Sequence, residues 1–293
     1  MAEASQRPSF GAALAERRPT LVYIASMSHA GSTLLDLLVS GHSEIVSVGE
    51  VKQLVRTPRR VRCSCGAESP AACPFWTDVD RRLKCHGAPG LEALDVRGTD
   101  PARFSADNLA LLKAVGQASG RRFIVDSSKN PRRLAYLLSD GGLDLRVIHL
   151  LRHPCGVAFS HARKGRSPVV AAAVQTRKTL YLRWLLRRTP HLEIRYEQLA
   201  DAPAATLGRV MGWLGLAMEP GQLDFAGRER HNLGGNRMRF SADSTIARDT
   251  RWEVGLTPLQ KALVSVVSAP ARVPGADSAY ALWRWLRRGR SDP

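Results

Sequence analysis

The chain has 293 residues, 44% of them hydrophobic, and a formal net charge of +17. This length and composition support a substantial core, in one large domain or two small ones, and argue against a disordered chain. The positive charge indicates an anionic ligand or partner, such as a phosphorylated cofactor, a nucleic acid or an acidic membrane surface, although biased base composition also produces Arg-rich chains.

No apolar run is long enough to span a bilayer, and the first twenty residues lack the hydrophobic centre of a signal peptide. We therefore expect a cytoplasmic protein with a flexible segment at residues 1–20. A single domain is expected over residues 21–293. An irregular insertion rich in Pro, Gly, Cys and Arg is expected at about 57–101.

Strands alternate with helices along the chain. Strands are expected at 21–24, just before Glu50, up to Asp126, at 145–152 and up to Tyr196. Helices are expected after Gly31 through Leu34–Leu38, at 106–119, at 131–138, after Pro154, at 169–188 and at 203–214. This alternation predicts an α/β fold with a central parallel β-sheet flanked by helices. Polar residues that follow strand ends would then meet at the carboxyl edge of the sheet.

The first strand end predicts an anion site. Gly31, Ser32 and Thr33 offer successive backbone N–H groups and two hydroxyls at the start of a helix. The ATP-binding pattern GxxxxGK[ST] is not met, because Ser26 replaces its first glycine and Ser32 its lysine. A less charged group than a triphosphate is therefore expected there, and His29 is the loop's one side chain that could become cationic.

Three further strand ends carry candidate ligands. Lys129 follows Asp126, which would bind magnesium in a kinase but only order the turn in a metal-free transferase. Arg152 and Ser160 suit a second, separate phosphate. Tyr196 could contact a nucleobase or belong to the core.

Together these segments resemble the sulfotransferase superfamily, which transfers a sulfuryl group from 3′-phosphoadenosine 5′-phosphosulfate (PAPS). The resemblance covers about residues 21–263 and rests on HAGSTLL, VGE, DSSK, RHP with a later serine, YEQL and RDTRW, in the family's order. It implies a P-loop-like three-layer fold and a donor with two distant phosphate sites. It also explains the missing lysine, because the transferred sulfuryl group carries less charge than a γ-phosphoryl group and requires no metal.

The resemblance also assigns roles to individual residues. The expected phosphosulfate loop comprises His29, Ala30, Gly31, Ser32, Thr33 and Leu34. Arg152 and Ser160 resemble the pair that holds the 3′-phosphate, with Lys164 assisting. Lys129 resembles the lysine that neutralises charge near the bridging oxygen, and Tyr196 the residue that contacts adenine.

The sequence departs from the family's pattern at two points. His29 stands where the loop normally carries Lys or Arg, and the Arg-Lys-Gly triplet that many cytosolic members place on the 3′-phosphate is absent. Arg239 is the residue that we expect to substitute for the triplet, with Arg248 as the alternative.

Transfer to a hydroxyl requires a base. Glu50, in SVGEVKQL, resembles the base of tyrosylprotein and some bacterial sulfotransferases, and His42 is the weaker candidate. Glu50 could instead be only an acid favoured by a helix N-terminus. Burial would raise its pKa and Lys129 would lower it, so the sequence leaves the balance open.

The cysteines leave three states open. Cys63, Cys65, Cys73 and Cys85 could be free, disulfide-linked or zinc-bound, but a CxC pair without CxxC is a weak metal signal, so no metal site is assigned. We expect their segment to help form the acceptor pocket or its lid. The C-terminal ALWRWLRRGR could contact a membrane surface or close the core.

The acceptor itself remains open, as a small molecule, a glycan or a lipid-linked compound, and so does the oligomeric state. Two other classes also remain, a P-loop kinase using ATP and magnesium and a basic nucleic-acid-binding protein. The missing lysine argues against the first. The ordered strand-end residues argue against the second, and no nucleic acid is expected as a partner.

Overall fold

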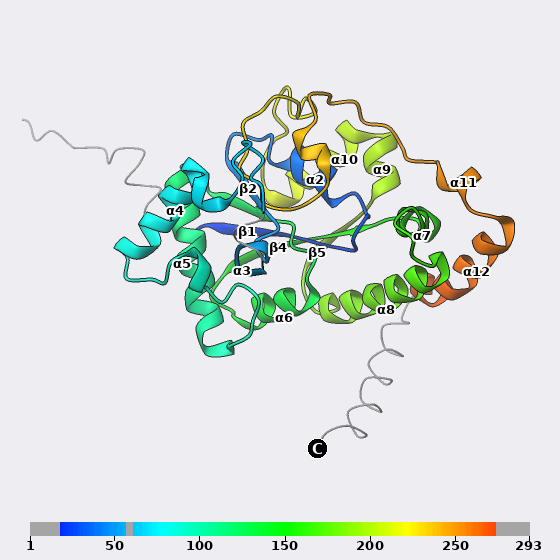
Figure 1. The fold of residues 1–293 in the computed structure, drawn as a ribbon, viewed down its shortest axis with the longest axis horizontal. Helices are drawn as coiled ribbons and strands as arrows, with labels where there is room; N and C mark the ends of the chain where they lie inside the picture. Colours follow the sequence, from blue (N-terminus) through cyan, green and yellow to red (C-terminus); the bar gives the residue numbers. More distant parts are fainter. Residues whose placement is uncertain (1–17, 57–60, 274–293) are drawn as a thin grey trace, which may run out of the picture.

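The computed structural model describes residues 18–56 and 61–273, and a five-stranded sheet lies at its centre (Figure 1). The strands are β1 (Thr20–Ser26), β2 (Ile45–Gly49), β3 (Phe123–Asp126), β4 (Asp144–Leu151) and β5 (His191–Arg195). Their order is β2-β3-β1-β4-β5, and every neighbouring pair is parallel. The parallel sheet predicted from the sequence is thus confirmed.

Helices cover both faces of the sheet. One layer contains α2 (Ser32–Val39), α9 (Tyr196–Asp201) and α10 (Pro203–Leu214); the other contains α3 (Gln53–Arg56), α4 (Pro74–Cys85), α5 (Pro101–Ser119), α6 (Pro131–Ser139) and α8 (Pro168–Leu186) (Figure 1). Successive strand residues point to opposite faces. Accordingly Leu21 and Tyr23 of β1 pack in the second layer, whereas Val22 and Ile24 pack in the first. The three-layer α/β fold is confirmed.

A smaller apolar cluster lies to the right of the sheet in Figure 1. It joins α7 (Pro154–Ala162) and α8 to α11 (Trp252–Gly255) and α12 (Pro258–Ser268). The chain that follows α10 therefore runs across the carboxyl edge of the sheet and back to α7. This path brings residues beyond 220 to the strand ends.

The observed elements differ from the expected ones mainly at their ends. Helix α5 begins at Pro101 rather than near residue 106, because the Asp100 carboxylate caps it by accepting a hydrogen bond from the Ala102 N–H (3.0 Å). The stretch expected to be irregular also contains α4. Tyr196 opens α9 instead of closing β5.

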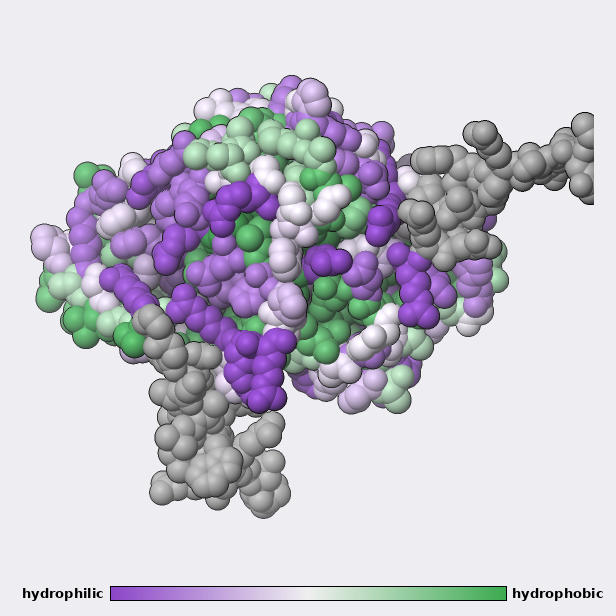
Figure 2. All heavy atoms as spheres, turned by 180° about the vertical axis from the view of Figure 1, so that it is seen from behind, coloured by the Kyte–Doolittle hydropathy of each residue, from purple (hydrophilic) through white to green (hydrophobic). Residues whose placement is uncertain are grey.

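Two expectations concern residues outside the described part of the chain. Most of the 1–20 segment, and all of the tryptophan- and arginine-rich stretch at 281–290, lie there. Among residues 18–56 and 61–273, no helix has the length and apolar character needed to cross a bilayer. The face seen in Figure 2 carries hydrophilic and hydrophobic patches side by side.

Candidate active site

The carboxyl ends of the strands bring together segments that are distant in the sequence. Glu50 follows β2 directly, and Lys129 follows the neighbouring β3. The loop after β1, at the centre of the sheet, lies between them and Arg152, which follows β4. Tyr196 follows β5 at the opposite edge of the sheet.

The loop between β1 and α2 has the backbone geometry of an anion cradle. Gly31 adopts φ 92° at the N-terminus of α2. A Cβ atom there would lie 2.5 Å from the ring of Tyr196, so both the conformation and the close contact require glycine. The N–H groups of the first turn of a helix have no acceptor within the helix. Those of Ser32, Thr33 and Leu34 therefore suit an anionic ligand.

His29 does not supply a cation to this loop at neutral pH. Its pKa is lowered to about 4 by burial and by the positive charges of Lys164, His161, Lys129 and Arg152. Its Nε2 atom lies 3.3 Å from the Lys164 Nζ atom, which donates to the neutral ring. Lys164 thus places a positive charge where the sequence shows a histidine.

Glu50 lies between two lysines. Its carboxylate is 2.6 Å from the Nζ atom of Lys129 and 3.0 Å from that of Lys52. Burial alone would raise the pKa of Glu50, but the two ammonium groups outweigh it, so the pKa lies below its ordinary value of 4.5. Glu50 is therefore ionised at neutral pH and can accept a proton.

The turn that carries Lys129 is strained and held in place. Lys129 adopts φ 54°, a left-handed conformation that is uncommon for residues with a side chain. The Tyr23 hydroxyl accepts a hydrogen bond from the Asn130 N–H and donates one to the Asn130 carbonyl, both at 2.9 Å. The Lys52 ammonium also donates to the Ser128 carbonyl (2.5 Å). These bonds hold the turn in the conformation that brings the Lys129 side chain to Glu50.

A glycine-rich segment joins Glu50 to the anion loop. The Leu233 carbonyl accepts from the Glu50 N–H at 2.6 Å, and the Asn236 N–H donates to the Thr33 hydroxyl at 3.1 Å. Between them, Gly234 and Gly235 have φ values of 69° and 92°. A Cβ at Gly234 would come within 3.2 Å of the Glu50 side chain. The segment therefore closes one side of the site.

A buried network of hydrogen bonds joins the segments that carry the site. Asp36 of α2 accepts hydrogen bonds from the Ser127 hydroxyl (2.6 Å) and the Asn232 amide (3.0 Å). The Asn232 amide also donates to the Ser47 hydroxyl at 2.8 Å. Burial raises the pKa of Asp36, and these hydrogen bonds oppose it. The network holds α2, β2 and the turn after β3 in one arrangement.

Asp126 has a structural partner. Its carboxylate accepts from the Ser128 N–H at 2.8 Å and from the Arg133 Nε–H at 2.7 Å, and both charged side chains are fully buried. A buried charge pair of this kind fixes the start of α6. The kinase hypothesis needs Asp126 as a magnesium ligand, and the pairing argues against that role.

Arg152 is bound on three sides. Its guanidinium donates to the His29 carbonyl at 2.8 Å and to Asp249 at 3.0 Å, and it lies 4.4 Å from the centre of the Tyr196 ring. The positive charges of Arg251 and Arg152 hold the pKa of Asp249 far below its usual range. In the described structure, therefore, a carboxylate already neutralises the arginine that the sequence assigns to a phosphate.

Tyr196 links that arginine to the segment containing Asp249. Its hydroxyl donates to the Ala247 carbonyl (3.3 Å) and accepts from the Asp249 N–H (3.1 Å), and its ring is buried against Gly31. Contact with adenine stays a prediction. The ring's established contacts are with the loop and with Arg152.

The remaining candidate ligands lie in different places. Ser160, on α7, donates to the Gly156 carbonyl of its own helix (2.9 Å). The Arg239 guanidinium donates to the carbonyls of Asn232 (2.6 Å) and Arg62 (2.8 Å), beside the cysteine segment. Arg248, the alternative, pairs with Asp201 (2.9 Å). Neither arginine contacts Arg152 or Ser160, and a role for Arg239 on the 3′-phosphate stays a prediction.

His42, the second candidate base, lies at the amino end of β2, whereas Glu50 follows its carboxyl end. It precedes β2, its Nε2 atom lies 3.1 Å from the Ala217 carbonyl, and its Nδ1 atom accepts from the Glu44 N–H. The Glu44 carbonyl in turn accepts from Phe123, the first residue of β3. The geometry therefore favours Glu50.

Sequence reasoning missed three residues of the site. The position of Lys52, two residues after Glu50, was a signal that could have identified it. Asp249 lies within RDTRW. The family resemblance includes this segment but assigned no role to its aspartate. Asn236 had no local signal, because its contact with Thr33 spans most of the chain.

Comparisons with known proteins identify the family of the chain and relatives of its fold. A sequence model described as the sulfotransferase family matches residues 19–220. The chain belongs to this family, and it is therefore a sulfotransferase enzyme. No curated protein sequence matches it significantly.

Two solved structures share the fold. The sulfotransferase domain from the curacin biosynthetic pathway is 19% identical, with a TM-score of 0.54 over 87% of this chain and 98% of that one. The sulfotransferase domain from the Synechococcus PCC 7002 olefin synthase is also 19% identical, with a TM-score of 0.52 over 91% and 98%. At these identities the likeness extends to the fold alone.

Proposed function

We propose that this enzyme transfers the sulfuryl group of PAPS to a hydroxyl or amine of an acceptor and releases 3′-phosphoadenosine 5′-phosphate (PAP). The observation that carries the proposal is the Glu50 carboxylate, 2.6 Å from the Lys129 ammonium, beside the anion loop. A base, a cation and a set of N–H donors are the groups that sulfuryl transfer requires.

In this proposal the 5′-phosphosulfate lies against the N–H groups of Ser32, Thr33 and Leu34, and Lys164, 3.3 Å from the His29 ring, supplies a positive charge to the loop. The 3′-phosphate lies at Arg152 and Ser160. A phosphate there would replace Asp249 as the partner of Arg152, since both are anions. The intramolecular pair supports an anion site at Arg152, because the guanidinium already binds a carboxylate, 3.0 Å away, where a phosphate would lie.

The chemical step follows from the positions of Glu50 and Lys129. The acceptor oxygen or nitrogen forms a bond to sulfur while the bond between sulfur and the bridging oxygen breaks. The acceptor proton passes to Glu50, and the electron pair of the broken bond stays on the 5′-phosphate of PAP. Lys129 stabilises the charge on that oxygen. When Lys129 turns to the donor, Glu50 loses one counter-ion and becomes more basic.

A cavity of about 350 Å³ lies between α3 and the segment that follows it, and its lining includes neither Glu50 nor Lys129 nor a residue of the anion loop. Its lining includes Leu54, Trp76 and Leu91, and mostly belongs to residues 69–93, within the predicted insertion. The first residue of α3, Gln53, donates from its N–H to the Glu50 carbonyl at 2.8 Å. We infer that this segment shapes the acceptor pocket, as its position in the sequence predicts.

Two measurements test the proposal. Titration with PAP in the absence of metal should give saturable binding, whereas ATP with magnesium should bind weakly. Incubation with PAPS and a panel of phenols, sugars, amines and lipid-linked alcohols should give a sulfated product and stoichiometric PAP. Failure to bind PAP, or binding only of ATP with magnesium, would overturn the proposed donor.

A further inference from the structure

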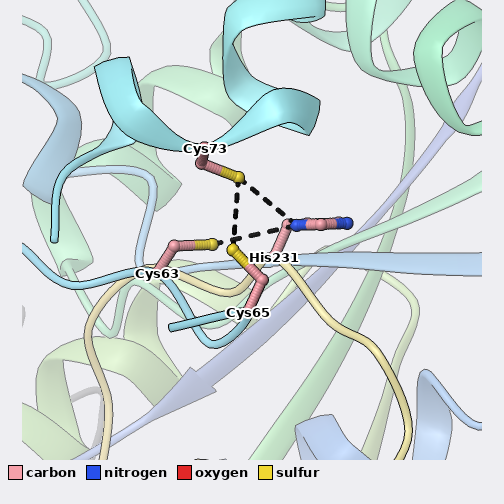
Figure 3. Close-up of side chains that lie close together, drawn as sticks. All are labelled: Cys63, Cys65, Cys73 and His231. Carbon is pink, nitrogen blue, oxygen red and sulfur yellow. Dashed lines mark hydrogen bonds between the residues drawn. The ribbon is translucent and has the colours of Figure 1, made fainter. Parts of the chain in front are cut away.

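Three cysteines and a histidine converge on one point outside the catalytic groups. Figure 3 shows the side chains of Cys63, Cys65, Cys73 and His231 directed toward one another. Their sulfur atoms and a ring nitrogen all lie within 4.8 Å of one another. Cys85, which the sequence grouped with the other cysteines, lies at the exposed end of α4 and is not part of this cluster.

The spacing of the four atoms matches a tetrahedral metal ion. Zinc with Zn–S bonds of about 2.3 Å and a Zn–N bond of about 2.0 Å places its ligand atoms about 3.5–3.8 Å apart. The Cys65 and Cys73 sulfurs are 3.6 Å apart, and the His231 Nδ1 atom lies 3.3 Å from the Cys73 sulfur and 3.9 Å from that of Cys63. These distances are far longer than a disulfide bond of about 2.05 Å.

The surroundings hold the histidine in a ligating orientation. Phe75 stacks on the His231 ring, with centroids 4.8 Å apart and an interplanar angle of 7°. The Trp76 indole donates to the His231 carbonyl at 2.8 Å. The second ring nitrogen of His231, Nε2, lies 3.6 Å from a Glu229 carboxylate oxygen. A carboxylate on that side favours a proton on Nε2 and leaves Nδ1 free to bind metal.

We propose that Cys63, Cys65, Cys73 and His231 bind one zinc ion. Thiolate sulfur and imidazole nitrogen are the ligands that zinc prefers in closed tetrahedral sites. Because four protein ligands complete the coordination, the ion has no open position for substrate. The site is therefore structural, and it revises the sequence-based assignment of no metal without adding a metal to the sulfuryl-transfer step.

The zinc would fix the backbone that supports Glu50. Two residues beyond His231, Leu233 forms β-bridges to both Gly49 and Cys63, and its carbonyl accepts the Glu50 N–H. Joining His231 to the cysteines closes a loop of more than 150 residues in the chain. Closing so long a loop by weak contacts alone is entropically costly, and a metal ion offsets that cost directly.

The test measures metal in the purified full-length enzyme. Elemental analysis of protein prepared without chelators should find about one zinc per chain. Replacing zinc with cobalt should produce thiolate-to-cobalt charge-transfer absorption. Less than about 0.1 zinc per chain together with no such absorption from the reduced protein would overturn the proposal.

Matched variants assign the ligands. Cys65→Ser and His231→Asn should lose most of the bound zinc, whereas Cys85→Ser and His86→Asn should retain it, since Cys85 and His86 lie at the exposed end of α4. Full zinc content in Cys65→Ser and His231→Asn would contradict the assignment.

A measurement on the wild type does not depend on how the variants fold. Chelation should expose Cys63, Cys65 and Cys73 to alkylation and speed hydrogen exchange at the Glu50 N–H. Added zinc should reverse both changes. Equal alkylation of these thiols before and after chelation would also contradict the proposal.

Discussion

The Glu50 carboxylate and the Lys129 ammonium lie 2.6 Å apart at the ends of neighbouring parallel strands. This contact joins the group proposed to take a proton to the group proposed to stabilise the leaving oxygen. It explains why Glu50 is ionised although it is buried, because the lysines lower its pKa more than burial raises it. The same contact must loosen when an anionic donor competes for Lys129.

Removing Lys52 should move the acid limb of the rate profile. Lys52→Met deletes one of the two cations that lower the pKa of Glu50, so that pKa rises and kcat begins to fall at higher pH than in the wild type. The profile of kcat against pH from 4 to 8 measures the shift. Lys113→Met, at an exposed position of α5, is the matched control. An unshifted acid limb in Lys52→Met would contradict this account of the Glu50 pKa.

The same pKa predicts a direction for stability against pH. The pKa of Glu50 is lower in the folded protein than its ordinary value of 4.5, so its contribution to stability is fully present above that value. The contribution is lost as the pH falls through the folded pKa. The wild type should therefore lose more stability to acid than Glu50→Gln does. Urea unfolding at pH 7 and pH 4 measures the loss of stability in each protein. Equal losses in the wild type and in Glu50→Gln would contradict the prediction.

Replacing Arg152 should weaken donor binding. A charged hydrogen bond to phosphate typically contributes ~1.5–3 kcal/mol, so Arg152→Ala should lower the affinity for PAP by about 10- to 150-fold. Isothermal titration with PAP measures this loss. Arg209→Ala is the comparison, because Arg209 is exposed on α10 and should have a small effect. If Arg152→Ala binds PAP like the wild type, the 3′-phosphate lies elsewhere and Arg239 becomes the next candidate.

Neutralising Asp249 should have the opposite effect. Its carboxylate lies 3.0 Å from the Arg152 guanidinium and would repel a phosphate bound there. Asp249→Asn keeps the shape and removes the charge, so PAP should bind about three- to tenfold more tightly. Asp243→Asn, on an exposed loop of the same segment, controls for net charge. Weaker binding in Asp249→Asn would mean that Asp249 positions Arg152 instead of competing for it.

A permanent cation at position 29 should help donor binding. His29 is neutral at pH 7 because its pKa is lowered to about 4, so His29→Arg should retain or improve affinity for PAPS, and His29→Ala should slow transfer. Lys164→Ala should lower affinity by about two- to fivefold, the effect of one exposed charge. Steady-state kinetics with varied PAPS measures these changes. Normal turnover in His29→Ala would show that the loop backbone suffices without the histidine.

The sequence was most informative where chemistry and strand ends coincide. Glu50, Gly31, Lys129 and Arg152 each follow a strand of the predicted parallel sheet, and a parallel sheet brings such residues to one edge without further information. The fold class was predictable for the same reason. Local patterns of apolar residues, turns and helix caps determine the strands and most helices.

Contacts made by the long connection after α10 were not predictable from local patterns. His231 meets Cys73 across 158 positions, and Asp249 meets Arg152 across 97. The partners share no spacing that a periodic pattern would reveal, because loop packing sets them rather than secondary structure. The direction of the Glu50 pKa shift was also open, since it depends on the distance to Lys52 as well as to Lys129.

The most direct test of the central claim compares Glu50→Gln with the wild type in single turnover, using acceptors of differing acidity. Loss of a positioned base typically costs ~10²–10⁴-fold in rate, so Glu50→Gln should bind PAP normally and lose turnover by that factor with an alcohol acceptor. An acidic phenol that is already ionised should recover part of the rate. Glu44→Gln, which changes an exposed glutamate at the amino end of β2, should behave as the wild type. Full rates for Glu50→Gln with every acceptor would contradict the claim that Glu50 is the base.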